Sequence, residues 1–391
     1  MPTAIVQLEL SDPPSTLRVG ESYDRAFVVG RLSGRPVAHA VLSVVDGIVD
    51  RESVFDHVAA WLASRSSHHP PGSGTRESAA PRDPPSATVA VCSRDRPDDL
   101  RRCLVALARV RGDGCEVIVV DNDAVSPGAT AAVAGEFAAV RCVRETRPGL
   151  SAARNRAIAE SSGDVVCFTD DDAVPEPGWL DALRAPFDDP MVWCVTGLTL
   201  PLELETEAQE LFERHTSHGR GYEARRFRGA ETNPLAIGQV GAGVNMAIRR
   251  TAFEQIGAFD PALGAGSPAR AGEDYDLFTR ILAAGFHIAY EPAAVVWHRH
   301  RRDPRDLKSA FYAYSVGVYA YLTRTLLVER EPAAIRYGAK WLFQHQLPAL
   351  WRALLGDPGA LPLSFRTAEL RALAVAPALY LAGRIRRRSD R

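Results

Sequence analysis

The stretch that most constrains this chain is residues 161–180, SSGDVVCFTDDDAVPEPGWL, in which a short apolar run leads directly into three consecutive aspartates. The run VVCF is too short and too rich in β-branched residues for a helix, so it predicts a buried strand. Asp170, Asp171 and Asp172 follow at its end, where adjacent carboxylates repel one another unless a cation lies among them. The stretch predicts a site for Mg²⁺ or Mn²⁺, completed by substrate phosphates and water. The alternative is a solvated acidic turn that caps the next helix.

The length and the charge balance of the chain limit the classes of function. With 391 residues, of which 46% are hydrophobic and 24% charged, the chain is long enough for two or three globular domains. Its formal net charge of −2 excludes the strongly basic field that is typical of nucleic-acid-binding proteins. We therefore expect a small molecule or a local surface as partner, and no nucleic acid.

The cysteines and the first residues of the chain bear on its location. The six cysteines show no CxxC pairing and no His–Cys ligand spacing, and several lie in apolar runs, so we expect buried free thiols. The start, MPTAIVQLELSDPP, has no basic region followed by an apolar core, and no secretory signal is visible. The sequence therefore favours a cytoplasmic location.

Composition divides the chain into four segments. Residues 1–65 combine two β-type runs, AFVVGRL and PVAHAVLSVV, with an amphipathic helix over 52–64, which predicts a small α+β domain. Residues 66–86 are rich in Pro, Gly and Ser and predict a flexible linker, so we expect the first domain to fold separately. Residues 87–303 form an α/β domain that contains the aspartates, and residues 304–391 form a helical region with a basic tail.

Strands alternate with helices in the α/β domain, which predicts a parallel sheet with ligands beyond the carboxyl ends of the strands. Ser93 and Asp121 end two of the apolar runs, ATVAVCS and CEVIVVD, just as the aspartates end a later one. Neither a dinucleotide-binding GxGxxG pattern nor a P-loop follows any strand. The polar residues at these strand ends therefore need another explanation.

A second polar cluster lies further along the chain. Glu273, Asp274 and Asp276 begin a predicted helix, DYDLFTRILAAG, that ends at Gly285, and the predicted strand AVVW leads into His298. Acidic residues in a first turn also favour the helix dipole without any other role. The cluster by itself leaves a functional and a purely structural interpretation open.

After about residue 304 the pattern becomes helical. AFYAYSVGVYAYLTRTLL is aromatic and amphipathic, and LRALAVAPALYLAGRIRRRSDR ends in a group of arginines. Its apolar part is too short, and too interrupted by Pro377, to span a bilayer. Two interpretations stay open: a basic amphipathic surface in peripheral contact with the inner face of a membrane, or helices packed on the preceding domain with a solvated tail.

The ordered motifs between residues 87 and 300 resemble the family 2 glycosyltransferases, which are inverting enzymes of the GT-A fold. The resemblance rests on CSRDRPDDLRRCL, VIVVDND, RPGLSAARNRAI, DVVCFTDDDAVPEPGWL, GAGVNMAIRR, GAFDPALG, GEDYDLFTRILAAGFHIAY and VVWH, in the family's order. It implies a Rossmann-like mixed sheet, a divalent metal, and a nucleotide-diphosphate sugar as donor, with a UDP-sugar favoured. It covers neither the first domain nor the C-terminal helices.

The resemblance also implies roles for individual residues. Asp170 and Asp172 match the family's DxD pair and, with His298, are the implied metal ligands, while Asp274 matches the catalytic base. The start CSRDRP departs from the family's usual Pro-Thr-aromatic start, and this departure affects the contacts to the base and ribose. The residues implied to contact the nucleotide sugar are Ser93, Arg94, Asp95, Asp121, Arg154, Asn155 and Asp171.

These residues predict the transfer of a sugar from a nucleotide diphosphate to an acceptor hydroxyl with inversion. The metal would neutralise charge on the leaving diphosphate, and Asp274 would take the hydroxyl proton on the opposite face of the sugar. The acceptor is a glycan, a lipid-linked molecule or a small molecule. The alternatives are a nucleotidyltransferase, which would normally carry a glycine-rich loop after its first strand, and a catalytically silent module that binds sugar nucleotides.

Overall fold

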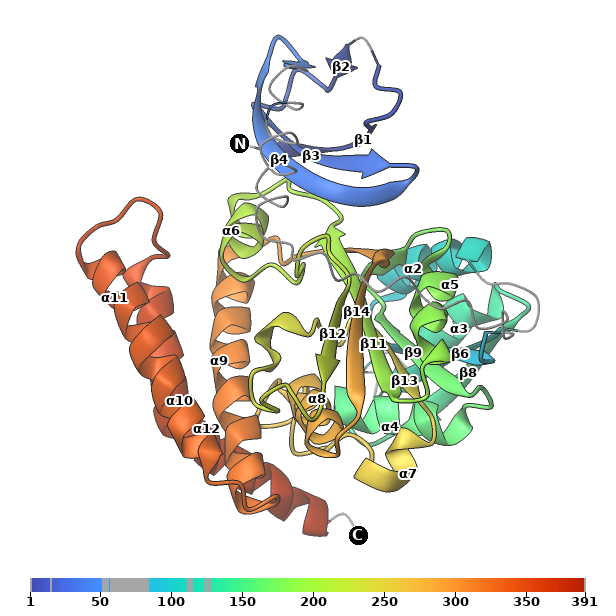
Figure 1. The fold of residues 1–391 in the computed structure, drawn as a ribbon, viewed down its shortest axis with the longest axis vertical. Helices are drawn as coiled ribbons and strands as arrows, with labels where there is room; N and C mark the ends of the chain where they lie inside the picture. The colour runs from blue at the N-terminus through green and yellow to red at the C-terminus, as the bar shows by residue number, and fades with distance from the viewer. Residues whose placement is uncertain are drawn as a thin grey trace.

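The computed structural model describes residues 2–14, 16–50, 56, 84–110, 115–122, 125 and 128–389. It consists of an N-terminal sheet, a central α/β domain, and C-terminal helices that cover one side of that domain (Figure 1). Nearly all of the helix expected over 52–64, and the linker as far as residue 83, lie outside the described residues.

The N-terminal sheet contains five strands in the order β1-β3-β4-β5-β2. Strands β3 and β4, which correspond to the two predicted β-type runs, form a hairpin whose turn residues Ser33 and Gly34 have φ values of 51° and 75°. Such positive φ angles match the right-handed twist of paired strands. The strands are β1 (Thr3–Glu9), β2 (Leu17–Arg18), β3 (Arg25–Leu32), β4 (Arg35–Val45) and β5 (Ile48–Val49).

The two faces of β3 pack against different partners. Ala26 and Val28 lie in the core of the N-terminal sheet itself, whereas Phe27 and Val29 lie in a cluster shared with the central domain. Successive side chains of a strand point to opposite faces, so β3 is buried on both. The residues that the central domain contributes to the shared cluster are Leu198, Leu200, Leu204, Tyr290, Val295 and Trp297.

The central sheet has nine strands, in the order β10-β14-β11-β13-β9-β6-β7-β8, with β12 paired to β14. Neighbours β6, β7, β8 and β9 run parallel, but β13 lies antiparallel between β9 and β11. The strands are β6 (Ala87–Ser93), β7 (Glu116–Asn122), β8 (Val140–Glu145), β9 (Val165–Asp170), β10 (Ala173–Pro175), β11 (Val192–Pro201), β12 (Arg225–Arg228), β13 (Asn245–Arg249) and β14 (His287–His298).

The sheet is therefore mixed, as the family resemblance implied, and not parallel, as the alternation of strands with helices predicted. Alternation indicates helical crossovers, which produce parallel neighbours. Between β11 and β13 the chain instead passes through α6 (Glu207–Thr216), β12 and the short helix η2 (Ile237–Gln239), and β13 runs in the opposite direction.

Helices cover both faces of this sheet (Figure 1). The apolar face of α2, made by Leu100, Leu104 and Leu107, packs on one side against alternate residues of β6 and β7. The other side packs against α4, α7, α8 and the C-terminal helices. The helices of the central domain are α2 (Pro97–Val110), α3 (Ala129–Gly135), α4 (Leu150–Glu160), α5 (Trp179–Arg184), η1 (Ala185–Asp188), α6 (Glu207–Thr216), α7 (Ala252–Ile256) and α8 (Glu273–Ala283). All six cysteines carry free thiols, as expected.

The register of the parallel strands brings the predicted polar residues to one edge. Ser93 of β6 lies opposite Asp121 of β7, and Cys92 lies opposite Asp170 of β9. The carboxyl ends of parallel neighbouring strands lie along the same edge of a sheet. The side chains at the ends of β6, β7 and β9 therefore lie along one edge.

The C-terminal helices begin with α9, whose N-terminus is capped by Asp303, a side chain that accepts a hydrogen bond from the Arg305 amide at 2.7 Å. Gly272, just before α8, lies so close to α9 that a Cβ atom on it would be 2.5 Å from the Gly317 carbonyl oxygen. Helix α9 therefore positions the start of α8. Among the described helices, none has an apolar segment long enough to cross a bilayer. The helices are α9 (Pro304–Leu327), α10 (Ala333–Trp341), the π-helix η3 (Leu342–Gln346), α11 (Leu347–Leu354) and α12 (Leu363–Ser389).

Candidate active site

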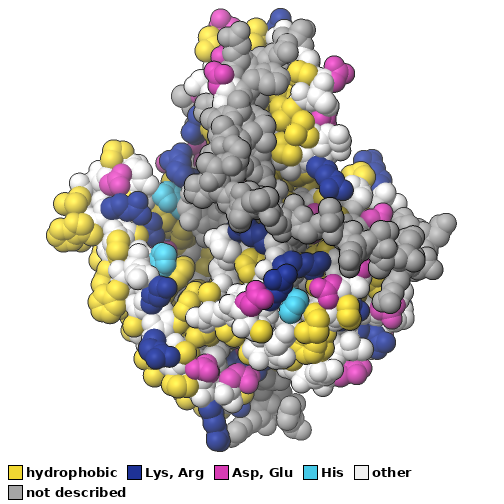
Figure 2. Space-filling view, in the orientation of Figure 1, with side chains coloured by type: hydrophobic (Ala, Val, Ile, Leu, Met, Phe, Trp, Pro, Cys, Tyr) yellow, Lys and Arg dark blue, Asp and Glu magenta, His cyan; other side chains and the backbone are white. Residues whose placement is uncertain are grey.

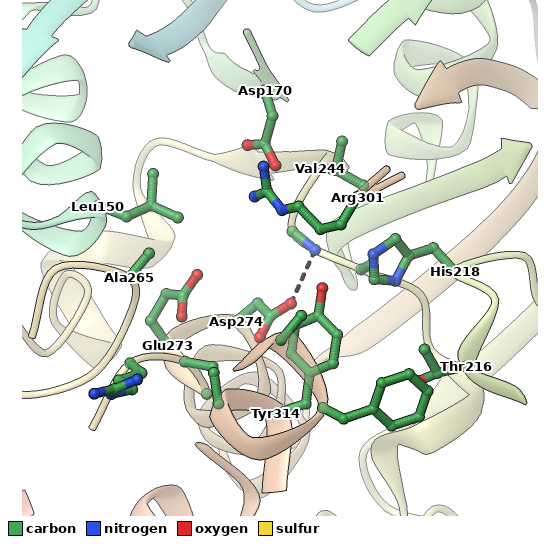
Figure 3. Close-up of a pocket in the computed structure, with 18 of the residues that line it drawn as sticks. Leu150, Asp170, Thr216, His218, Val244, Ala265, Glu273, Asp274, Arg301 and Tyr314 are labelled. Carbon is green, nitrogen blue, oxygen red and sulfur yellow. Dashed lines mark hydrogen bonds between the residues drawn. The ribbon is translucent and has the colours of Figure 1, made fainter. Parts of the chain in front are cut away.

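A cavity of about 930 Å³ lies between the carboxyl-end edge of the sheet and the C-terminal helices. Figure 3 shows Asp170, His218, Asp274 and Tyr314, from distant parts of the sequence, around the same space. Its volume is within the range of cavities that bind small molecules. The central domain and the C-terminal region therefore form one candidate site.

Three of the predicted residues form a candidate metal centre. One ligand atom from each of Asp170, Asp172 and His298 lies within 4.8 Å of the others. His298 is brought there by strand pairing, since it lies opposite Ala173, the residue after Asp172. Its Nε2 atom is 3.2 Å from Asp172 Oδ1. Two carboxylates and an imidazole are suitable ligands for a divalent cation, so the residues fit the metal that the sequence predicts.

Asp171 has protein partners on both of its oxygens. Ser93 Oγ donates to Asp171 Oδ2 at 2.8 Å, and Arg96 Nη1 lies 3.1 Å from Asp171 Oδ1 and 3.0 Å from Asp172 Oδ2. Burial, with the adjacent Asp172 charge, raises the pKa of Asp171 to about 7. Arg96 was not among the predicted site residues. The signal that could have found it is its place in CSRDRP, the segment that departs from the family pattern.

Arg154 connects the candidate metal centre to helix α8. Its Nη1 atom donates to Glu273 at 2.9 Å, and its Nη2 atom donates to Asp170 at 3.4 Å and to the Gly243 carbonyl oxygen at 3.1 Å. The guanidinium also lies over the Phe168 ring. Since the side chain is only 3% exposed, this network fixes the position of the first turn of α8 relative to β9. Burial, with the Asp274 charge, raises the pKa of Glu273 to about 7.

Asp274 is held in the cavity by backbone donors. The Gly243 amide donates to Asp274 Oδ2 at 2.9 Å, which is the dashed line in Figure 3, and the Tyr275 amide donates to Oδ1 at 2.8 Å. A Cβ atom at Gly243 would lie 2.9 Å from Arg154 Nη1 and 3.2 Å from Asp274 Oδ2. The absence of a side chain at Gly243 thus allows Arg154 and Asp274 to approach the same backbone segment.

The residues predicted to contact the nucleotide are not all brought together. Ser93 and Arg94 line the cavity, as do Arg154 and Asp171, but Asp95, Asp121 and Asn155 are not among its lining residues.

Asn155 is instead bonded to the backbone of Phe259. It donates to the Phe259 carbonyl and accepts from the Phe259 amide, each at 2.9 Å. Asp95 accepts from the Val125 amide at 3.1 Å. Asp121 is buried beside Asn122, which does line the cavity. Arg154 and Asn155 point to different surroundings because a helix places consecutive side chains on different faces.

An aromatic group completes the cavity beside the candidate metal centre. The His218 ring centroid lies 5.4 Å from that of His298 and 5.1 Å from that of Phe212, and Tyr314 lies 6.1 Å from His218. Burial lowers the pKa of His218 well below its usual value. Of this group the family motifs implied only His298, because Phe212, His218 and Tyr314 lie in segments that the motifs do not cover.

The sequence of the central domain matches a known family. Residues 88–257 match the model of glycosyl transferase family 2. This region is a family 2 glycosyltransferase domain. It contains the candidate metal-binding aspartates and Arg154, while Asp274 and His298 follow it in the chain.

Curated relatives of the chain are also glycosyltransferases by name. The pre-mycofactocin glycosyltransferase of Mycobacterium tuberculosis is 30% identical over 275 residues, which are 69% of this chain and 54% of that protein. The probable glycosyltransferase YdaM of Bacillus subtilis is 27% identical over 226 residues, 55% of this chain and 51% of that protein. The chain thus spans about half the length of these relatives.

A solved structure has the same fold. The mannosyltransferase PcManGT from Pyrobaculum calidifontis, in complex with GDP-Man and Mn²⁺, matches with a TM-score of 0.51 over 84% of this chain and 87% of that chain. The two sequences are 21% identical. The glycosyltransferase domain therefore has the GT-A type of mixed α/β fold, as the sequence motifs implied.

Proposed function

We propose that this protein is an inverting glycosyltransferase that transfers a sugar from a nucleotide diphosphate, with UDP favoured, to an acceptor hydroxyl. The observation that carries the proposal is that one cavity contains both the Asp170–Asp172–His298 cluster and the carboxylate of Asp274. These are the two parts that such a reaction needs: charge neutralisation for the leaving group and a base for the incoming hydroxyl.

Asp170, Asp172 and His298 would hold Mg²⁺ or Mn²⁺. A divalent cation there would supply neutralisation of the charge that develops on the departing diphosphate. The name of the Pyrobaculum calidifontis structure supports a nucleotide sugar and a divalent metal for this fold. The preference for UDP comes from the family resemblance alone, so the nucleotide base is part of the proposal to be tested.

Asp274 would accept the proton of the acceptor hydroxyl. The Gly243 and Tyr275 amides each donate to one of its oxygens, which orients the carboxylate toward the cavity. Attack by the hydroxyl on the anomeric carbon, on the face opposite the leaving diphosphate, forms the new glycosidic bond as the old one breaks. A single displacement of this kind inverts the anomeric configuration.

The residues around the metal cluster would place the donor. Ser93 and Arg94 follow β6 at the cavity edge and would contact the nucleotide, while Asp171 is held by Ser93 and Arg96. Arg154 would keep Asp170 and the start of α8 at a constant separation. The acceptor would be a glycan, a lipid-linked molecule or a small molecule. The protein would act in the cytoplasm, in peripheral contact with a membrane through its C-terminal region.

The test is a thermal-shift screen of UDP- and GDP-sugars with and without Mn²⁺, followed by analysis of the products that the best ligand gives. We expect one donor to raise the melting temperature only with metal, because ligands that bind the native state stabilise it. We also expect slow release of nucleoside diphosphate. Release of inorganic diphosphate would indicate a nucleotidyltransferase, and binding without any product would indicate a silent binding module.

A further inference from the structure

The last helices of the chain present an apolar surface that nothing in the described structure covers. We call residues 333–389, which form α10, η3, α11 and α12, the C-terminal arm. In Figure 1 the arm lies outside α9, on the side away from the sheet, and Figure 2 shows yellow and dark blue side chains along it. Its exposed large hydrophobic residues are Ile335, Phe343, Leu347, Trp351, Leu354, Leu355, Leu363, Leu373, Leu381 and Ile385.

These residues follow the period of a helix. Phe343, Leu347 and Trp351 recur at intervals of four, and Leu354 and Leu355 continue the series. Phe343 is 65% exposed and Trp351 is 63% exposed. The opposite side of the arm is buried against the rest of the protein, through Ala334, Ala372 and Tyr380, which share a core cluster with residues of α8 and α9. The arm therefore has an inner apolar face that is packed and an outer one that is open.

The charges on the arm are nearly all positive. Residues 333–389 contain nine Lys and Arg residues but only two acidic residues, Asp357 and Glu369. Glu369 is paired with Arg366 at 2.8 Å. Five exposed basic residues form no ion pair with any residue that the structure describes: Arg336, Lys340, Arg352, Arg371 and Arg386.

We propose that the outer face of the C-terminal arm docks on an anionic lipid surface. A helix that combines exposed Trp, Phe and Leu with unpaired Arg and Lys can bury its apolar side at the headgroup boundary while its cations attract anionic lipids. A second copy of this chain is a poor occupant, because a symmetric interface would place one basic arm against another. The excess of positive charge and the exposed apolar residues of the arm therefore both favour an anionic lipid surface as the partner.

The docked arm would bring the reaction cavity to the lipid surface. Trp341, His345 and Gln346 line the cavity, whereas Phe343 and Leu347, in the same turns, lie outside it. One short segment therefore contacts both the cavity and the proposed lipid surface. This part of the inference rests on the proposed function, and it selects a lipid-linked acceptor from the three classes proposed above.

The experiment measures binding of the full chain to vesicles of phosphatidylcholine with and without phosphatidylglycerol, by co-sedimentation at low and high salt. We expect binding only to the anionic vesicles, and weaker binding at high salt. Replacing Arg336 and Lys340 by Gln should weaken binding about 25-fold, at about fivefold for each basic residue near the surface. Replacing Phe343 and Trp351 by Ser should weaken it about tenfold or more.

The control is a double variant of the N-terminal sheet, Val41→Ser with Val45→Ser, since these side chains are 49% and 69% exposed but lie far from the arm in the sequence. It should bind as the unaltered protein does. Equal binding to both kinds of vesicle, or no effect of the Phe343 and Trp351 changes, would overturn the proposal. The proposal would also be overturned if light scattering showed a dimer for the unaltered protein and a monomer for the variant with Phe343 and Trp351 replaced by Ser.

Failure of this inference is distinguishable from failure of the proposed function. Co-sedimentation needs neither donor nor metal, so it reports on docking alone. Donor hydrolysis in vesicle-free solution should be unchanged in the Phe343 and Trp351 variant, because neither residue lines the cavity. Docking without any hydrolysis would contradict the proposed function, and hydrolysis without docking would contradict the inference.

Discussion

The two walls of the cavity differ in the kind of residue that forms them. The motif wall comes from the ends of β6, β9 and β14 and the start of α8, and it is a network of charged groups centred on Arg154 and Arg96. The helical wall comes from α6, α9, η3 and α12, and much of it is aromatic, with Phe212, Phe311 and Tyr314.

This difference indicates that the two walls have different functions. Charged groups in a partly buried network require exact partners, because a buried charge without one costs several kcal/mol. Aromatic side chains instead supply contact area that adapts to ligands of different shape. We therefore infer that the motif wall holds the donor and performs the chemistry, whereas the helical wall selects the acceptor. The following predictions test this assignment of donor and acceptor to the two walls.

The largest effect is expected at the motif wall, for Asp172→Ala. Loss of one of three clustered ligands should abolish transfer and metal-dependent donor binding. The fold should persist, because the change relieves repulsion among adjacent carboxylates while Arg96 keeps Asp171 as an ion-pair partner at 3.1 Å. Donor titration with and without Mn²⁺ checks this, and Asp98→Ala is the control, since the Asp98 side chain is 90% exposed. Normal turnover of the Asp172 variant would remove the metal-site assignment.

The next effect is expected for Asp274→Asn. Asparagine keeps the size of the side chain but cannot take up a proton, so turnover should fall about a hundredfold or more while donor affinity hardly changes. Single-turnover transfer and donor titration measure the two separately. Glu273→Gln is the matched comparison. It should lower turnover less, because Glu273 is not the proposed base and its carboxylate is bonded to Arg154. A loss of donor binding alone in the Asp274 variant would assign that carboxylate to the donor instead.

A smaller and different effect is expected at the helical wall. Trp341→Ala should raise the KM for acceptor about tenfold, which corresponds to about 1.4 kcal/mol, and leave donor hydrolysis unchanged. Phe343→Ala, two residues further on and outside the cavity, should leave the acceptor KM unchanged with a soluble acceptor. If the Trp341 variant impaired donor binding as strongly as acceptor binding, the two walls would not be separable.

The smallest effect on the chemistry is expected for Phe27→Ala in the N-terminal sheet. Phe27 is 1% exposed and packs in the cluster that contains Trp297, the neighbour of His298. Its removal should lower the free energy of unfolding by about 3–5 kcal/mol, the cost of a cavity in a core. Donor binding below the melting temperature should change little. Denaturant unfolding measures the first quantity, and Val45→Ala at an exposed position is the control. An unaltered unfolding midpoint would mean that the sheet folds separately, as the linker composition predicts.

Much of the motif wall could be predicted from local sequence. The apolar run before Asp170 is a buried strand, the acidic start of α8 is where the pattern placed it, and Asp170, Asp172 and His298 meet as the family motifs implied. Strand and helix periodicity act over a few residues, so a single sequence contains them. The direction of β13 was beyond this reasoning, because it depends on how the connections before and after the strand pack.

By itself, the sequence of this protein determined the family of its central domain, the strand ends at which polar residues gather, and the helical character of the C-terminal region. The tertiary structure alone decided the partners of those residues: Arg96 bridges two aspartates, Asn155 bonds to the backbone of Phe259, and His218 lies beside His298. The physical reason is the short range of the interactions that connect these residues. Hydrogen bonds and ion pairs form only over a few ångströms, and packing brings together these residues, which are 75 to 104 positions apart in the chain.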